Sequence, residues 1–199
     1  MKILNLYAGI GGNRKLWGDE HEITAVENNQ DIAKIYQDFF PNDKVVVGDA
    51  HQYLLDHYNE FDFIWSSPPC PTHSDIRRCG VHAGQYGAVY PDMALYQEII
   101  LLKHFAPLEC KWVVENVKPY YKPLIEGNLI HRHLFWTNFN IDEYIEKNKR
   151  KHSNIIGGST VYGFNITDMK TRGYSGGKRK ILRNLINPEL GLHILNQVK

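Results

Sequence analysis

Cysteine is scarce in this sequence of 199 residues, which contains only Cys70, Cys79 and Cys110. Three cysteines are too few, and odd in number, for a disulfide framework, so we expect a reducing compartment. Cys70 and Cys79 have no second pair of ligands at a metal-like spacing, and the histidines show no ligand spacing either. The sequence therefore predicts no metal site.

Long hydrophobic runs and a signal-peptide pattern are also absent. A membrane-spanning helix needs about 20 consecutive apolar residues, so we expect no membrane span and a cytoplasmic protein. Internal repeats and low-complexity tracts are not found. The apolar and charged fractions of 43% and 23% are ordinary, and the length is sufficient for one domain with a sizeable core.

The net charge of +1 hides a strong asymmetry along the chain. Residues 147–199 contain eleven basic and two acidic residues, a net charge of +9, which leaves −8 for the first 146 residues. A basic segment attached to an acidic body favours a polyanionic partner. A solvated loop and tail would have the same composition, and the charge alone does not separate the two.

Short apolar runs alternate with segments of helical spacing, which predicts an α/β fold with a mostly parallel, doubly wound sheet. The predicted strands are Lys2–Tyr7, Ile23–Val26, Val45–Val47, Phe61–Trp65, Trp112–Val114 and Leu134–Phe139. The predicted helices are Asn13–Trp17, Asp31–Phe40, Pro91–Phe105 and Leu182–Ile194. Thr72–Tyr90 is polar and without period, which is typical of a mobile loop or lid, and 140–180 predicts an irregular region with room for one helix and a hairpin.

Three predicted strands end in residues that suit a ligand cleft. A glycine-rich turn, Ala8–Gly12, follows the first strand, Glu27 ends the second, and Asp49 follows the third. Parallel strands bring their carboxyl ends to one edge of a sheet. The turn lacks the full G-x-G-x-x-G pattern, so phosphate binding is not implied. Each residue alone is explained by a turn or a helix cap, but in this order they predict an adenosine-binding cleft.

Two further strand ends carry reactive side chains. The fourth strand ends in Ser66-Ser67-Pro68-Pro69-Cys70-Pro71, where two prolines fix φ and force the chain out of the sheet. A buried, inert cysteine is the ordinary explanation of such a turn. The next strand, however, ends in Glu115-Asn116-Val117 and would place a carboxyl group in the same cleft as the Cys70 thiol.

These motifs together resemble the DNA cytosine-5 methyltransferases, and the resemblance extends from Asn5 to about Pro188. In the order of that family, they are Asn5-Leu6-Tyr7-Ala8-Gly9-Ile10-Gly11-Gly12, Glu27, Asp49, Pro68-Pro69-Cys70, Glu115-Asn116-Val117 and Arg183-Asn184. The resemblance implies a Rossmann-like fold that binds S-adenosylmethionine, with residues 1–139 as the catalytic domain. It assigns 140–180 to a short basic segment for target recognition, and 181–199 to a helix returning to the catalytic domain.

The sequence departs from the family at several positions. Asn5 and Tyr7 stand where the family has aspartate and phenylalanine. The family's Gln-Arg-Arg strand motif is present only as His131-Arg132-His133, with His133 at the position of the arginine that helps to hold the cytosine. The recognition region is strongly reduced, as in the compact members carried by phages and mobile elements.

The resemblance implies methyl transfer to C5 of cytosine in double-stranded DNA. The Cys70 thiolate would add to C6 of a flipped-out base, and its pKa should be lowered by a helix N-terminus or by Arg77, Arg78 or Arg132. Glu115, with a raised pKa, would bond the pyrimidine N3 edge, and Asn116 would hold Glu115.

Further roles follow from the same resemblance. The expected catalytic residues are Cys70, Glu115, Asn116 and Arg132. The expected S-adenosylmethionine contacts are Tyr7, Ala8, Gly9, Gly11, Glu27, Asn28, Asp49, Ala50, Pro69 and Asn184. The expected DNA contacts are Arg77, Arg78, Lys149, Arg150, Lys151, Lys178 and Arg179.

Two alternatives stay open at the level of the sequence. The same chemistry could act on cytosine in tRNA. The chain could also be a non-catalytic subunit that binds the cofactor and DNA, and a partner protein could supply further DNA recognition.

Overall fold

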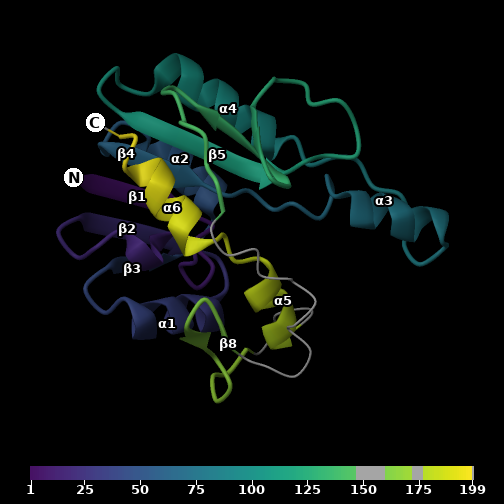
Figure 1. The fold of residues 1–199 in the computed structure, drawn as a ribbon, viewed down its shortest axis with the longest axis horizontal. Coiled ribbons are helices and arrows are strands. Elements are labelled where there is room, and N and C mark those ends of the chain that lie inside the picture. Colours follow the sequence, from purple (N-terminus) through teal and green to yellow (C-terminus); the bar gives the residue numbers. More distant parts are fainter. Residues whose placement is uncertain (147–159, 172–176, 199) are drawn as a thin grey trace.

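A seven-stranded sheet forms the centre of the computed structural model, which describes residues 1–146, 160–171 and 177–198 (Figure 1). The strand order is β3-β2-β1-β4-β5-β7-β6, and β7 is the strand that runs antiparallel to its neighbours. The strands are β1 (Lys2–Leu6), β2 (Glu22–Glu27), β3 (Lys44–Val47), β4 (Phe63–Ser66), β5 (Lys111–Val117), β6 (Asn128–Ile130) and β7 (His133–Thr137). The predicted mostly parallel α/β fold is confirmed.

Helices cover both faces of the sheet (Figure 1). One face packs against η1 (Arg14–Leu16), α1 (Gln30–Phe39) and α6 (Pro188–Leu195). The other face packs against α2 (Ala50–His57) and α4 (Ala94–Phe105). The remaining helices are α3 (Asp75–His82), which stands away from the body, and α5 (Gly177–Arg183). Within the described residues, no helix combines the length and the apolar character that crossing a membrane requires.

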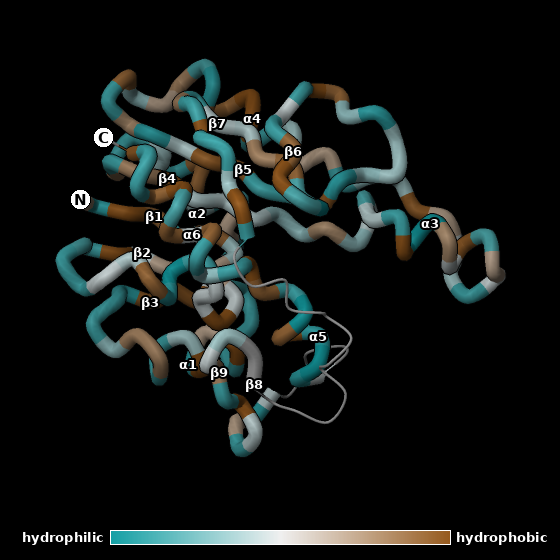
Figure 2. The backbone as a smooth tube through the Cα atoms, viewed as in Figure 1, coloured by the Kyte–Doolittle hydropathy of each residue, from teal (hydrophilic) through white to brown (hydrophobic). Residues whose placement is uncertain are grey.

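Side-chain alternation along β1 explains the two-layered core. Ile3 faces the α6 side, whereas Leu4 and Leu6 face α2 and α4, and all three are fully buried. The hydropathy view shows this concentration of apolar residues in the middle of the sheet (Figure 2). Asn5 is the buried polar residue of this strand, and its side-chain oxygen accepts a hydrogen bond from the Asn13 amide at 2.8 Å.

Two helices contradict the sequence prediction or were missed by it. Thr72–Tyr90, predicted as a loop, contains α3, because the Ser74 hydroxyl caps its N-terminus by accepting from the Arg77 amide. The α2 helix was not predicted, and it begins where the Asp49 carboxylate accepts from the amides of His51 and Gln52. Both helices depend on N-terminal capping rather than on a clear apolar period.

The C-terminal helix is also divided, contrary to the prediction. The single helix expected over Leu182–Ile194 is split into α5 and α6. Pro188 lacks an amide proton and occupies the first turn of α6, and the Asn187 side chain caps that turn by accepting from Glu189.

The described part of region 140–180 contains a small hairpin, β8 (Thr160–Val161) and β9 (Phe164–Asn165). Phe164 is fully buried and packs edge-on against Phe39 of α1 at 4.8 Å between ring centroids. The Lys15 ammonium lies 4.0 Å from the Phe164 ring centroid. These contacts attach the hairpin to the body of the protein.

A buried ion pair joins the start of η1 to the loop before β3. The Arg14 guanidinium donates to both carboxylate oxygens of Asp43, at 2.9 and 3.0 Å, and both side chains are 3% exposed. The Tyr36 hydroxyl donates to the same carboxylate at 2.7 Å. Because buried charges are stable only when paired, removing one partner should be costly.

We predict that Arg14→Met lowers the free energy of unfolding by about 3–5 kcal/mol, because Asp43 would remain buried without its cation. Lys34→Met is the matched control, since Lys34 pairs with Asp38 on the exposed surface, and its cost should stay below about 1 kcal/mol. Urea denaturation of the two variants measures the difference, and equal losses would contradict this account of the pair.

Candidate active site

The turn after β4 presents Cys70 at the carboxyl edge of the sheet. Its carbonyl accepts from the amides of His73 and Ser74, at 3.0 and 3.2 Å, which closes the turn toward α3. Pro68 is buried, and Cys70 itself is half-buried. The thiol is therefore held in a defined place that is not sealed by the core.

Glu115 lies on the neighbouring strand and reaches the same edge. Ser66 of β4 pairs with Val114 of β5. The residues that follow them, Ser67 and Glu115, therefore lie at the same end of the sheet. The Glu115 side chain is only 7% exposed. Burial raises its pKa to about 7, against the opposing effects of a hydrogen bond from Ser67 and the charge of Arg132. The predicted rise of the pKa of Glu115 is confirmed.

The structure brings the Cys70 thiol and the Glu115 carboxyl together, but it contradicts the predicted thiol pKa. Burial, and then the charge of Glu115, raise the pKa of Cys70, and they outweigh Arg132 and Lys180. The other proposed cations are engaged elsewhere: Arg77 donates to the Gly87 carbonyl, and Arg78 pairs with Asp75.

Asn116 holds a different group from the one predicted. Its side-chain amide donates to the Pro68 carbonyl at 2.9 Å, and its oxygen accepts from the Val117 amide. Asn116 therefore ties β5 to the proline turn that carries Cys70, rather than positioning Glu115 by a direct bond.

The His131-Arg132-His133 segment places two basic groups beside Glu115. His133 opens β7 opposite Val117, and its Nε2 lies 3.7 Å from Glu115 Oε1. Arg132 is exposed in the preceding turn, yet its charge acts on both Glu115 and Cys70. The sheet register thus places His133 on β7. Arg132 lies in the turn before this strand and acts on the site through its charge.

The glycine-rich turn and Glu27 form the candidate cofactor site. Glu27 ends β2, and its carboxylate accepts from the amides of Gly9 at 3.1 Å and Asn29 at 2.9 Å. Burial raises the pKa of Glu27, and backbone hydrogen bonds oppose the rise. Gly9 has φ +55°, and a Cβ placed on it would meet nothing within 4 Å, so the turn has open space beside it.

The other predicted residues of this turn, Tyr7, Ala8 and Gly11, differ in how closely they are packed. Tyr7 has φ +54° and is partly buried, and its hydroxyl donates to Glu98 at 2.6 Å. Ala8 is buried, and Gly11, at φ +83°, is closely packed by Tyr36 and Phe40, which leave no room for a side chain there. Gly11 is therefore explained by packing against α1.

The residues predicted around the adenine and methionine ends are also located. Asp49 is exposed and caps α2, whereas the methyl group of Ala50 packs into the core. Asn28 and Pro69 are exposed at the ends of β2 and of the proline turn. Asn184 follows α5 and lies two residues before Ile186, whose backbone packs against Gly12. The far end of the chain thus returns to the glycine turn.

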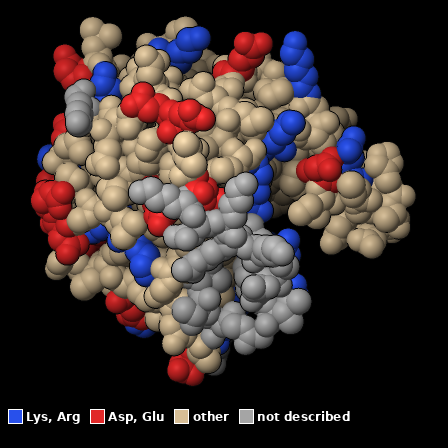
Figure 3. Space-filling model, viewed as in Figure 1, with Lys and Arg blue, Asp and Glu red and all other residues tan. Residues whose placement is uncertain are grey.

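Four of the seven predicted DNA-contacting residues lie on two described helices. Arg77 and Arg78 are on α3, and Lys178 and Arg179 are on α5. Lys149, Arg150 and Lys151 lie outside the described residues. The space-filling view shows basic side chains along the notch between the body and α3, and acidic ones at the opposite side of this face, along its top and on the arm itself (Figure 3).

Glu98 of α4 is a polar residue that the sequence prediction missed. It is 1% exposed and receives hydrogen bonds from Tyr7 and Ser66. The available signal was an acid within an apolar helical run, at a position between the buried Leu95 and Leu102. Such an acid must find partners in the fold, although its partners are not visible in the sequence.

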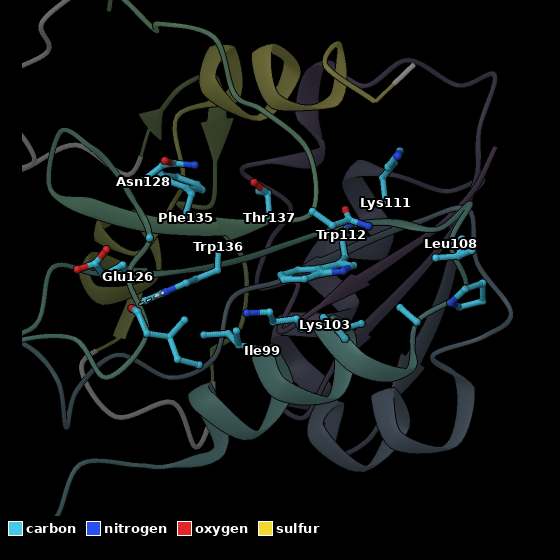
Figure 4. Close-up of a pocket in the computed structure, with 16 residues that line it drawn as sticks. Ile99, Lys103, Leu108, Lys111, Trp112, Glu126, Asn128, Phe135, Trp136 and Thr137 are labelled. Atoms are coloured by element: carbon cyan, nitrogen blue, oxygen red, sulfur yellow. Dashed lines mark hydrogen bonds between the residues drawn. The ribbon is translucent and has the colours of Figure 1, made fainter.

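A separate hollow of about 650 Å³ lies between the C-terminal half of α4 and the strands β5 to β7 (Figure 4). Lys103, Trp112 and Trp136 line it, and the Trp136 indole donates to the Ile125 carbonyl at 2.9 Å. Neither Cys70 nor Glu115 belongs to this hollow, so the candidate active site lies elsewhere. Among the described residues, no group of three or more His, Cys, Asp or Glu side chains could hold a metal ion.

Solved structures match parts of this chain at low sequence identity, and the following three have TM-scores below 0.5. A SAM-dependent methyltransferase of Agrobacterium tumefaciens is 14% identical with a TM-score of 0.45, over 61% of this chain and 40% of its own. A hypothetical protein of Thermus thermophilus is 17% identical with a TM-score of 0.48, over 68% and 73%. A methyltransferase of Entamoeba histolytica is 16% identical with a TM-score of 0.39, over 59% and 38%. The chain thus spans 40% of the length of the Agrobacterium enzyme.

No curated protein matches the sequence. The family model described as C-5 cytosine-specific DNA methylase, however, matches residues 1–122, more than half of the chain. The match includes the glycine turn, Cys70 and Glu115, and it ends before Arg132 and Asn184. The chain therefore belongs to the C-5 cytosine-specific DNA methylase family, whose methyl donor is S-adenosylmethionine, as the sequence motifs predicted.

Proposed function

We propose that the protein transfers a methyl group from S-adenosylmethionine to C5 of cytosine in double-stranded DNA. One observation carries this proposal: the Cys70 thiol and a buried, protonatable Glu115 lie together at the carboxyl edge of the sheet. A nucleophile beside a carboxyl group is the arrangement that addition to a pyrimidine ring requires.

The glycine turn and Glu27 fit the cofactor. The open space beside Gly9 allows a ligand to approach the backbone, and the Glu27 carboxylate can accept from ribose hydroxyls. When bound, S-adenosylmethionine supplies the electrophilic methyl group. Tyr7 and Asn184 would border the methionine end, Asp49 the adenine, and Asn28, Ala50 and Pro69 would add backbone or van der Waals contacts.

Cys70 would activate the target base by forming a covalent bond. Its thiolate adds to C6, the electron pair of the C5–C6 double bond makes C5 nucleophilic, and C5 takes the methyl group. Loss of the C5 proton then restores the double bond and expels the thiolate. Because the pKa of Cys70 is raised, the thiolate is a minor form at neutral pH and is correspondingly reactive once formed.

Glu115 would donate its proton to N3 of the ring as negative charge develops there. A carboxyl group with a pKa of about 7 is partly protonated at neutral pH, which ordinary glutamate is not. Such electrostatic stabilisation contributes about 3 kcal/mol for one well-placed group. His133 and Arg132 would position the carboxyl group and the base edge.

DNA would reach the site beside α3. The target base must leave the duplex stack, at a cost of a few kcal/mol, before Cys70 can reach C6. Arg77, Arg78, Lys178 and Arg179 would contact phosphates, together with the basic residues 149–151. In this proposal residues 1–139 form the catalytic domain, 140–180 the recognition segment, and 181–199 the returning helical end.

The choice of nucleic acid is tested with labelled S-adenosylmethionine and either duplex DNA or tRNA, followed by bisulfite sequencing of the product. Label in C5 of DNA cytosine is the expected result. Label in tRNA alone would replace DNA by RNA as the substrate, and binding of both ligands without transfer would indicate a non-catalytic subunit.

We predict that the protein forms a covalent complex with duplex DNA that contains 5-fluorocytosine, because fluorine at C5 prevents the elimination that releases Cys70. Cys70→Ala should abolish the complex on a denaturing gel. Cys79→Ala is the matched control, since Cys79 is exposed on α3 and outside the site, and should keep the complex. A complex that survives in Cys70→Ala would contradict the assigned nucleophile.

The pH profile of kcat/KM provides a second prediction. The active form needs neutral Glu115, whose fraction falls above about pH 7, and ionised Cys70, whose fraction rises up to its raised pKa. The two effects cancel between these values, so the wild-type profile should be flat there and fall on either side. In Glu115→Gln, kcat/KM at about pH 7 should be about 100-fold lower than in the wild type and should then rise about tenfold per pH unit over that range. A flat profile in the variant would exclude Glu115 as the titrating acid.

A further inference from the structure

Glu98 is a buried carboxylate in an otherwise apolar part of α4. Its side chain is fully buried, while its helix neighbours Leu95, Ile99 and Leu102 fill the core against the sheet. A carboxylate in such surroundings is stable only if hydrogen-bond donors surround it. The position of Glu98 is therefore set by the donors that meet it.

Three donors reach Glu98 from three separate segments. The Tyr7 hydroxyl donates to Oε1 at 2.6 Å, and the Ser66 hydroxyl donates to Oε2 at 2.5 Å. His51 Nδ1 lies 2.9 Å from Oε1. Burial and the Glu98 charge raise the pKa of Tyr7 far above its ordinary value, so its hydroxyl stays protonated and remains a donor.

Each of the three segments borders the candidate active site. Tyr7 directly follows β1 and opens the glycine turn, and its backbone adopts the left-handed conformation at φ +54°. Ser66 ends β4 and leads into the Cys70 turn, and it pairs with Leu6 in the sheet. His51 lies in the first turn of α2, beside Asp49. Glu98 thus connects the glycine turn, the Cys70 turn and the start of α2.

We propose that Glu98 is a positioning residue of the S-adenosylmethionine site, which fixes the glycine turn, the Cys70 turn and the α2 N-terminus relative to one another. This proposal rests on the function proposed above. Removal of the carboxylate frees the Tyr7 side chain and its left-handed backbone, so the turn loses the conformation that approaches the cofactor. Glu98 does not itself touch the reacting atoms.

Two substitutions at this position separate hydrogen bonding from packing. Glu98→Met fills a similar volume but accepts no strong hydrogen bond. Glu98→Gln can keep its oxygen toward Tyr7 and His51 and turn its amide toward the Ser66 hydroxyl, which can accept. Glu60→Met is the matched control, because Glu60 meets His57 Nδ1 of the same α2 helix at 2.8 Å on the exposed surface.

The measurement is calorimetric binding of S-adenosylhomocysteine without DNA, together with the KM for S-adenosylmethionine. We expect Glu98→Met to weaken binding about 10- to 100-fold, Glu98→Gln to restore it to within about fivefold of wild type, and Glu60→Met to leave it unchanged. The KM for DNA should change little. Equal binding by Glu98→Met and wild type would overturn the positioning role, whereas a wild-type protein that binds no S-adenosylhomocysteine would overturn the proposed function instead.

A double-mutant cycle covers the case in which Glu98→Met does not fold. Tyr7→Phe removes one of the three donors and should weaken cofactor binding several-fold, and Ser66→Ala should do the same. If Glu98 acts through these groups, Glu98→Gln should alter cofactor binding by a different factor in the Tyr7→Phe background than in the wild type. The network would be excluded if Tyr7→Phe and Ser66→Ala left cofactor binding unchanged and if Glu98→Gln altered binding by the same factor in both backgrounds.

Discussion

The parallel pairing of β4 with β5 is the constraint on which the rest of the site depends. Ser66 and Val114 are paired in the sheet, so the proline turn that follows one strand and Glu115 at the end of the other meet at the same edge. The Asn116 amide then ties the two strand ends together through the Pro68 carbonyl. Because this bond is between a side chain and the backbone, it fixes the turn whatever the conformation of the thiol.

Burial at this edge acts on both reactive groups in the same direction. It raises the pKa of Glu115, which suits a proton donor, and it raises the pKa of Cys70, which reduces the amount of thiolate. Burial therefore favours the neutral thiol of Cys70 over the thiolate. Arg132, in the turn before β7, and Lys180, on α5, supply positive charge that acts against the effect of burial.

Six of the seven strands of the main sheet and the reactive pair could be predicted because each rests on local signals, whereas the short edge strand β6 was missed. Apolar runs mark β4 and β5, and the two prolines before Cys70 end the strand wherever it lies. The α2 helix was not found this way: a helix cap was one explanation of Asp49, but residues 50–57 have no clear apolar period, and the capping bonds depend on the fold. The bond from Asn116 to Pro68 joins positions 48 residues apart, and the burial that raises the pKa of Cys70 arises from tertiary packing. Neither leaves a pattern in the sequence.

The arm formed by α3 and residues 83–90 is held by contacts of its own. The Tyr86 ring packs on Gly80, where a side chain would collide with it, and the Arg77 guanidinium bonds the Gly87 carbonyl and lies over that ring. At its base, the hydroxyl of Thr72 accepts from the amide of Asp92. Since the arm is already folded, little of its own conformational entropy would be lost when it packs against a ligand.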